Sequence, residues 1–260
     1  MPEIRVNGVT LYYEEHGDGE PILCIHGTGS SAAVWGGAAA ELAKHGRTIV
    51  YDRRGFSRSE RPEPLVMDVR LHTDDAAGLL DALDAAPAVV IGRSQGGEVA
   101  VDLALRHPDR VRALVLLEGG GLSLGESTRR WLGELDERVF AAAEADMGTV
   151  GETMLSGVLG AGGWAALPGP VQEMFTGNGP AIVAEHRGGH LDATAEELGA
   201  VAHPTLLVGA KASPPELVEM TGLMAAAMPS ARVKWVEGDH LIDPAHPAVL
   251  GFVDEVLGRT

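Results

Sequence analysis

The sequence predicts an α/β protein, a mostly parallel, twisted β-sheet with helices on both of its faces. The main observation is that short apolar runs alternate with longer amphipathic segments along most of the 260 residues. Uninterrupted apolar runs are typical of strands buried on both faces, as parallel strands are. The composition, with 45% hydrophobic and 22% charged residues, is ordinary for a folded globular protein. The length fits one large domain or a core with an insertion.

The predicted strands are of two kinds. The first two flank Asn7 and Gly8, a dipeptide that favours a tight hairpin, so this pair is antiparallel. The other six are apolar runs that alternate with helical segments, as strands of a parallel sheet do. In chain order the eight predicted strands are 4–6, 9–13, 21–26, 47–51, 88–91, 111–117, 205–208 and 232–236.

The segments between these strands have helical patterns. In 69–83, leucines recur on one face while aspartates occupy the other, which is typical of a helix that packs one side against a core. Repeated strand–helix units of this kind cover both faces of a sheet. The predicted core helices are 33–44, 69–83, 98–106, 217–228 and 248–257.

Residues 119–199 interrupt this alternation. They contain glycine clusters and a helical pattern at 127–145, but no strong strand run. We interpret this stretch as a helical lid inserted after the sixth strand, which divides the core into a first part (1–118) and a second part (200–260). A set of connecting helices without a functional role is the alternative.

The charge balance excludes some classes of partner. Acidic residues outnumber basic ones 37 to 20, a formal charge of −17, whereas nucleic acid and anionic membranes require a basic surface.

The single cysteine, Cys24, lies in an apolar run and cannot form an internal disulfide. With no signal peptide, no apolar run of membrane-spanning length and no His or Cys cluster for a metal, we expect a cytoplasmic protein that needs no cofactor. Its oligomeric state stays open.

A candidate nucleophile lies between the strand 88–91 and the helix that follows it. Residues 92–97 read GRSQGG, and a Gly-x-Ser-x-Gly pattern in this setting places the serine on a sharp strand-to-helix turn. The positive end of the helix then favours negative charge beside Ser94. A second match surrounds Ser123, but three glycines separate it from its strand, so we favour Ser94.

Two further segments lie where a serine nucleophile would need them. His240 follows the strand 232–236 and thus lies at the same edge of the sheet, where it can serve as the base for Ser94. Gly27 and Thr28 lie in a loop after an earlier strand. Their backbone N–H groups, with that of Gln95, are the predicted oxyanion hole.

Four segments in this order, 26–29, 52–59, 92–97 and 238–240, resemble the alpha/beta hydrolase superfamily, and the resemblance runs nearly end to end. It implies the alpha/beta hydrolase fold and a catalytic triad in the chain order serine, acid, histidine. It also implies that 52–59 is a structural loop beside the active site.

The acid departs from the common pattern of that superfamily, in which it follows the strand that corresponds to 205–208. Ala212 and Ser213 occupy that place here. Glu118 instead follows the strand 111–117 directly, at the same sheet edge, so we predict that it orients His240.

Two other carboxylates stay open as the acid, as does a site without one. Glu216 follows two prolines that are typical of a helix start, where a glutamate is more simply a partner of the helix dipole. Asp243 lies three residues after His240.

Within the superfamily, the segments 108–118 and 208–215 are similar to the fungal zearalenone lactone hydrolases. Those enzymes use a Ser–Glu–His triad and also lack the later acid. They carry a substrate-contacting tryptophan late in the lid, whereas 180–186 has none and Trp164 lies earlier.

We therefore predict a serine hydrolase that cleaves carboxylic esters, with lactones or other neutral apolar esters as substrates, through an acyl-enzyme. The lid residues assigned to substrate contact are Trp131, Met154, Leu155 and Trp164. The lid histidines His186 and His190 are expected to be solvated, with substrate contact as the alternative. Other readings are a ligand sensor, a cofactor-free lyase, and a hydrolase of carbon–carbon or amide bonds.

Overall fold

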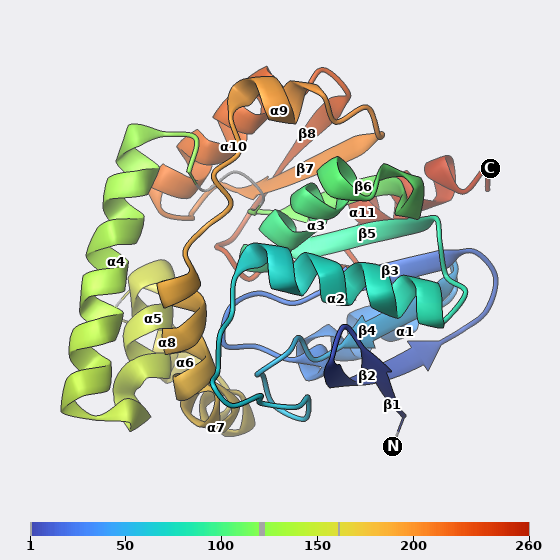
Figure 1. Cartoon of the computed structure of the whole chain (residues 1–260). Coiled ribbons are helices and arrows are strands. Elements are labelled where there is room, and N and C mark those ends of the chain that lie inside the picture. Colours follow the sequence, from blue (N-terminus) through green and yellow to red (C-terminus); the bar gives the residue numbers. More distant parts are fainter. Residues whose placement is uncertain (1, 120–122, 161, 260) are drawn as a thin grey trace.

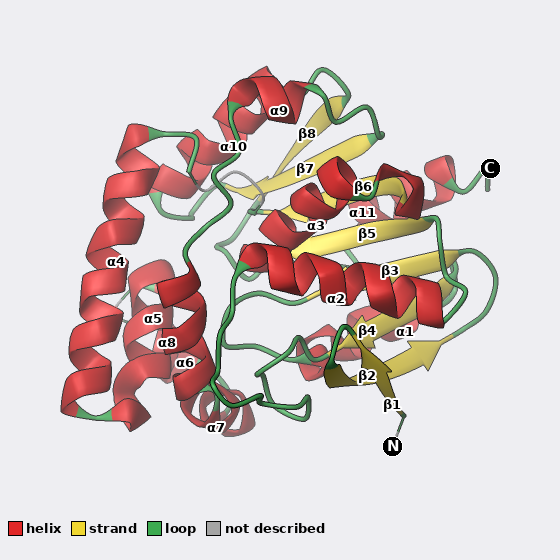
Figure 2. Ribbon diagram, in the orientation of Figure 1, coloured by secondary structure: helices red, strands yellow, loops and turns green. Residues whose placement is uncertain are grey.

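The computed structural model describes residues 2–119, 123–160 and 162–259, and it is built around one eight-stranded sheet (Figures 1 and 2). The strand order is β1-β2-β4-β3-β5-β6-β7-β8. β2 pairs antiparallel with β1 and with β4, and all other neighbours are parallel. The predicted fold class is therefore confirmed. The strands are β1 (Glu3–Val6), β2 (Val9–His16), β3 (Pro21–Ile25), β4 (Arg47–Tyr51), β5 (Ala88–Arg93), β6 (Val111–Leu117), β7 (Thr205–Ala210) and β8 (Ala231–Val236).

The turn between β1 and β2 has the predicted chemistry. Asn7 has φ 43° and Gly8 has φ 77°. Two consecutive residues with positive φ make the hairpin turn whose twist matches that of the flanking strands. Asn7 is held in this conformation by its side-chain amide, which donates to Asp75 Oδ1 at 2.9 Å.

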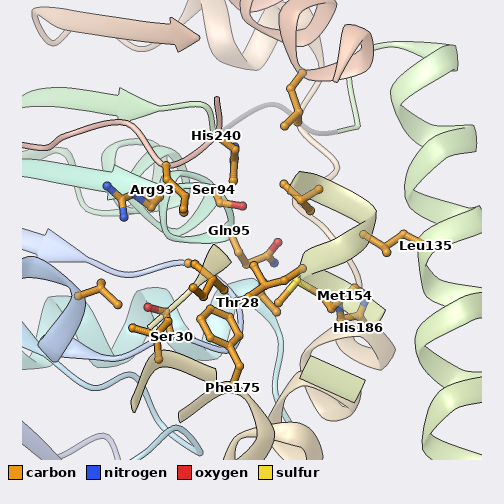
Figure 3. Close-up of a pocket in the computed structure, with 18 of the residues that line it drawn as sticks. Thr28, Ser30, Arg93, Ser94, Gln95, Leu135, Met154, Phe175, His186 and His240 are labelled. Atoms are coloured by element: carbon orange, nitrogen blue, oxygen red, sulfur yellow. The ribbon is translucent and has the colours of Figure 1, made fainter. Parts of the chain in front are cut away.

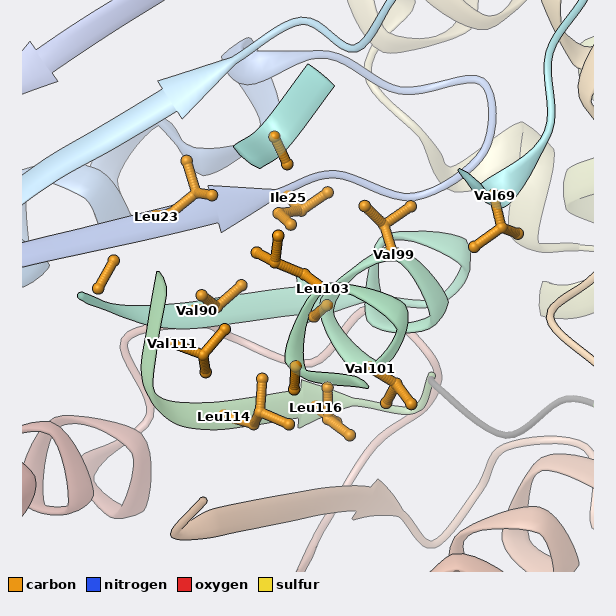
Figure 4. Close-up of a cluster of buried hydrophobic side chains, with 14 of the residues drawn as sticks. Leu23, Ile25, Val69, Val90, Val99, Val101, Leu103, Val111, Leu114 and Leu116 are labelled. Atoms are coloured by element: carbon orange, nitrogen blue, oxygen red, sulfur yellow. The ribbon is translucent and has the colours of Figure 1, made fainter. Parts of the chain in front are cut away.

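Helices cover both faces of the sheet, because strand side chains alternate between the two faces. On one face, Val90 of β5 packs in a buried cluster with α2, α3 and α10 (Figure 4). On the other face, Val89 and Ile91 pack with α1 and α11. The core helices are η1 (Ala32–Trp35), α1 (Gly36–Leu42), α2 (Val69–Ala82), α3 (Gln95–Arg106), η2 (Pro108–Arg110), α10 (Pro215–Ala227) and α11 (Pro247–Val256).

Between β6 and β7 the described chain is helical, as predicted, and Figure 1 shows its longest helix, α4, with α5 and α8 beyond one end of the sheet. We call the elements α4–α9 the helical insertion. Side chains of α4, α5, α7 and α8 form a third apolar cluster, which also includes Phe56 and Met67 of the core. The elements are α4 (Glu126–Ala145), η3 (Met147–Thr149), α5 (Val150–Leu159), α6 (Gly163–Ala166), α7 (Gly169–Gly177), α8 (Gly179–Gly188) and α9 (Ala195–Gly199).

A buried ion pair joins the helical insertion to the core. The Arg53 guanidinium, after β4, forms a two-pronged pair with the Glu185 carboxylate of α8, and neither side chain is more than 3% exposed. His72 Nε2 of α2 lies 3.3 Å from the same carboxylate. Burial alone would raise the pKa of Glu185, but Arg53 and His72 hold it well below its usual range. Glu185 is therefore ionised in the folded protein.

No helix in the described ranges is long and apolar enough to cross a membrane. Cys24, in β3, is fully buried, and burial raises the pKa of its thiol. This sulfur therefore behaves as a packing group of the core.

Candidate active site

Ser94 stands alone between the end of β5 and the first residue of α3, which is Gln95. Its backbone has φ 51° and ψ −124°, a conformation that residues other than glycine rarely adopt and that stores strain. A Cβ on Gly92 would lie 2.7 Å from the backbone of Gly97, and one on Gly96 would lie 2.6 Å from the His26 carbonyl oxygen. The two glycines of the motif therefore permit a turn that a side chain would block.

The predicted oxyanion residues lie beside this turn. A Cβ on Gly27 would be 3.2 Å from Ser94 Cβ, so the backbone of the loop after β3 packs directly against the serine. Gln95 is the first residue of α3, where backbone N–H groups have no partner within the helix. Gly27, Thr28, Ser94 and Gln95 line one cavity.

His26 holds this loop in place. Its Nε2 accepts the backbone N–H of Arg53 at 2.9 Å, so its Nδ1 carries the proton and donates to the Gly27 carbonyl at 2.8 Å. Burial, with the nearby Arg53 charge, lowers the pKa of His26, so the ring is neutral. These two hydrogen bonds give His26 a structural role in the loop.

Glu118 is the carboxylate that contacts His240. It is 1% exposed and follows β6 directly. Its Oε2 lies 2.9 Å from His240 Nδ1 and accepts the Ser213 hydroxyl at 2.6 Å. Its Oε1 accepts the backbone N–H of Ala210 at 2.7 Å. Because a carboxylate only accepts, the proton of the His240 contact is on Nδ1, which leaves Nε2 able to accept a proton.

The two other candidate acids lie elsewhere. Glu216 is in the first turn of α10, as expected of a partner of the helix dipole. Asp243 is exposed, and its Oδ1 accepts the backbone N–H of Ala245 at 2.9 Å. Among the described residues, Glu118 is thus the carboxylate bonded to His240.

Ser94 and His240 line the same cavity, and Figure 3 shows them next to each other at its sheet side. In the described part of the chain, no hydrogen bond of normal length joins the Ser94 hydroxyl to the imidazole. Such bonds are often long until a substrate is bound.

The cavity has a volume of about 470 Å³ and lies between the carboxyl edge of the sheet and the helical insertion. Its wall is mostly apolar, and no carboxylate is among its described lining residues. Of the four residues assigned to substrate contact, Trp131, Met154 and Leu155 line the cavity.

Trp164 does not line it, which corrects the fourth assignment. It lies on the short helix α6, where its ring is partly buried against the apolar cluster of the insertion. Its carbonyl accepts the Gln172 side-chain amide at 2.8 Å. This tryptophan therefore packs helices together.

The expectation that His186 and His190 are solvated is wrong, because both line the cavity. The His186 side chain is 6% exposed and that of His190 is 19% exposed. His190 Nδ1 lies 3.1 Å from Gln95 Oε1 and 3.4 Å from Glu98 Oε2. Burial opposes a charge on His190, but the Glu98 carboxylate outweighs it and raises the pKa of His190.

Sequence reasoning missed several polar groups of this region. The one signal for Ser213 is that it stands where the superfamily usually has its acid, and its hydroxyl donates to Glu118.

Of the second Gly-x-Ser-x-Gly match, residues 121 and 122 lie outside the described residues. Its Ser123 donates to the Leu191 carbonyl at 2.6 Å and does not line the cavity. Within the described ranges, no group of His, Cys, Asp and Glu is arranged to hold a metal ion.

The sheet order, the strained serine and the buried Glu118–His240 pair define a protein of the hydrolase class built on an α/β sheet. A family model for the alpha/beta hydrolase fold matches residues 20–161, which is more than half of the chain. The chain therefore belongs to the alpha/beta hydrolase fold family.

Relatives within this family have several activities. The chain is 40% identical to the 2-hydroxymuconate semialdehyde hydrolase of Pseudomonas sp. (strain CF600) over 124 residues, 46% of this chain and 44% of that protein. It is 35% identical to the putative carbamate hydrolase RutD of Azorhizobium caulinodans over 146 residues, 55% of this chain and 53% of that protein. The chain thus spans about half the length of the curated relatives it matches.

Solved structures match over the full length. Est816, described as an N-acyl homoserine lactone degrading enzyme, is 26% identical with a TM-score of 0.76 and full coverage of both chains. The enol-lactonase of Burkholderia xenovorans LB400 is 24% identical with a TM-score of 0.76 and 99% coverage of both chains, so it shares the fold.

Proposed function

We propose that this protein is a serine hydrolase that cleaves carboxylic esters through an acyl-enzyme, with lactones or other neutral apolar esters as its substrates. The observation that carries the proposal is the strained Ser94 in the same cavity as His240, whose Nδ1 is bonded to a buried carboxylate. A strained serine, an imidazole of defined tautomer and a buried carboxylate are the parts that acyl transfer requires.

In this mechanism the Ser94 hydroxyl attacks the ester carbonyl while His240 Nε2 takes its proton. Glu118 stabilises the imidazolium that forms, because it is already bonded to Nδ1 at 2.9 Å. The backbone N–H of Gln95, with that of Gly27 or Thr28, stabilises the oxyanion. His240 then protonates the leaving oxygen. Water, deprotonated by His240, releases the acyl group from Ser94.

The proposed triad is Ser94, Glu118 and His240, the Ser–Glu–His arrangement of the zearalenone-type lactone hydrolases. It is supported by the three hydrogen bonds that Glu118 accepts, from His240, Ser213 and Ala210. A buried carboxylate requires such partners. With all three made, Glu118 is held as the acceptor of the His240 proton.

We also propose that the helical insertion is a lid over the substrate, with the division 1–118, 119–199 and 200–260. Trp131, Met154 and Leu155 come from this insertion and line the cavity opposite the sheet. An apolar wall without carboxylates favours a small neutral substrate over a cation.

Carbon–carbon bond hydrolysis is the second candidate. It is favoured by the 40% identity to a 2-hydroxymuconate semialdehyde hydrolase over 124 residues. The same serine, histidine and oxyanion hole can act on a ketone carbonyl, so the substrate alone distinguishes the two reactions.

The test is labelling by a fluorophosphonate probe together with turnover of p-nitrophenyl esters, simple lactones and a 2-hydroxymuconate semialdehyde. Wild type and the control Ser123→Ala are expected to take the label and to turn over esters steadily, whereas Ser94→Ala does neither. Equal labelling of Ser94→Ala would refute the serine assignment. Turnover of the semialdehyde alone would select the second candidate, and at most one slow turnover of any compound would indicate a ligand sensor.

A further inference from the structure

A second histidine–carboxylate pair lies at the wall of the same cavity, contributed entirely by the helical insertion. His186 of α8 lines the cavity, and its Nδ1 lies 2.6 Å from Asp136 Oδ1 of α4. Figure 3 shows His186 beyond Met154, on the side of the cavity away from Ser94. This pair has no part in the proposed triad.

The hydrogen bond to Asp136 defines the polar face of the ring. An ionised carboxylate only accepts hydrogen bonds, so His186 Nδ1 carries the proton of this contact. A ring with this single proton on Nδ1 has a lone pair on Nε2. In the part of the chain that the structure describes, no protein group donates to this atom, although the His186 side chain is only 6% exposed.

The ring is held in position from the core side as well. The preceding residue, Glu185, makes the buried ion pair with Arg53 that joins α8 to the core. Two residues after His186, the backbone of Gly188 packs so closely against Met67 that a Cβ would overlap the Met67 carbonyl oxygen. His186 is therefore placed by contacts with α4 on one side and the core on the other.

The lining around His186 offers few other strong acceptors. No Asp or Glu is among the described residues that line the cavity, and the wall contributed by the insertion is otherwise mainly leucine, valine, methionine and aromatic side chains. A substrate hydroxyl or amide N–H that enters this end loses its water and needs an acceptor there. His186 Nε2 is a group that can supply it.

We propose that His186 Nε2 accepts a hydrogen bond from a hydroxyl or amide N–H of the substrate, and that the pair with Asp136 keeps the ring in the tautomer that does so. This inference rests on the proposed function and specifies it: the preferred substrate is an apolar ester or lactone with a hydrogen-bond donor remote from the scissile carbonyl. His186 is thus a specificity-determining residue, separate from the reacting atoms.

The test compares two p-nitrophenyl esters of equal chain length, one ending in a hydroxyl and one in a methyl group, on wild type and three variants. His186→Phe keeps the ring volume and removes the acceptor, and it is expected to lower kcat/KM for the hydroxyl ester about 10- to 100-fold, mainly through KM, as an unpaired buried hydroxyl does. For the methyl ester, the kcat/KM of His186→Phe is expected to equal or exceed that of wild type. His186→Gln places an amide oxygen near the position of Nε2 and is expected to restore most of the preference. Asp136→Ala removes the contact that fixes the His186 ring, and it is expected to lose part of the preference for the hydroxyl ester.

The methyl ester and the fluorophosphonate label report on folding and on the triad, because neither uses the proposed contact. If His186→Phe retains the wild-type ratio between the two esters, the inference about His186 is overturned while the proposed function stands. If His186→Phe loses kcat/KM equally on both esters and also loses labelling, His186 has a structural role, and the inference is overturned in this case too. If wild type turns over neither ester, the proposed function fails and this inference fails with it.

Discussion

Replacing Glu118 by glutamine tests how the proposed triad works. Glu118 Oε1 accepts the backbone N–H of Ala210 at 2.7 Å, and this amide cannot turn away, because it belongs to β7. The oxygen of a glutamine must therefore face Ala210, which places its NH₂ group toward Ser213 and His240. The Ser213 hydroxyl can rotate and accept, but the imidazole can accept only at a bare Nδ1. The proton of His240 then moves to Nε2, where the ring cannot act as base for Ser94.

The size of the effect follows from this tautomer change. Comparable loss of the orienting carboxylate in serine proteases costs about 10⁴-fold in kcat. We expect a decrease of about 10³- to 10⁴-fold for Glu118→Gln, which corresponds to about 4–5.5 kcal/mol of transition-state stabilisation. KM should change little, because Glu118 does not line the cavity.

The assay is steady-state hydrolysis of a p-nitrophenyl ester, with the rate of fluorophosphonate labelling as a second readout. Glu216→Gln and Asp243→Asn are the matched controls, since each removes one negative charge from a candidate acid that is not bonded to His240. Both are expected to stay within about 3-fold of wild type, because neither carboxylate is bonded to His240 or lines the cavity. A Glu118→Gln enzyme within 10-fold of wild type, or a large loss in either control, would refute the reasoning.

Three further predictions concern stability and the serine turn. Glu185→Gln is expected to lower the free energy of unfolding in urea by about 3–5 kcal/mol, because it leaves the Arg53 guanidinium buried without a counter-charge. The raised pKa of His190 means that its pairing with Glu98 contributes stability fully below pH 6.5, its ordinary pKa, and that this contribution is lost as the pH rises through the folded-state pKa. Urea denaturation of Glu98→Gln should lack this pH dependence. Gly96→Ala is expected to cost at least about 1–3 kcal/mol and to abolish labelling, since its Cβ would overlap the Ile25 carbonyl.

Each of these has a matched control. Glu173→Gln removes an exposed charge from α7 and should cost less than about 0.5 kcal/mol, so equal effects of the two glutamine variants would contradict the role of the ion pair. Gly251→Ala adds a Cβ on α11 where no atom lies within 4 Å, at an exposed position that does not line the cavity, so it should keep labelling unchanged and should not lower stability. A pH dependence of unfolding that is identical in wild type and Glu98→Gln would contradict the assignment to His190.

Most of the core was predictable because its signals are local. Local sequence alone favours the turn at Asn7-Gly8 and the strand conformation of β3, β5 and β6. The predicted bounds of these strands therefore agree with the structure to within a few residues. The differences lie where local signals are weak. The predicted helix 33–44 is a 3₁₀ turn followed by α1, with Ser31 accepting the N–H of Ala33 at its start. The core helix predicted from residue 98 begins at Gln95, immediately after the strained serine.

The sequence by itself determined that the chain forms a mostly parallel sheet and in which order strands and helices follow one another along the chain. It also placed Ser94, Glu118 and His240 at one edge of that sheet. The physical reason is that parallel strands end at the same side of the sheet, so a residue's place just after a strand already locates it in space. Only the tertiary structure decided which carboxylate meets His240, that Trp164 packs away from the cavity, and that His186 enters its wall. These contacts join segments up to 122 residues apart in the chain. They depend on how α4 and α8 dock on the core, and that docking is determined by shape and by the buried Arg53–Glu185 pair, which no local pattern reveals.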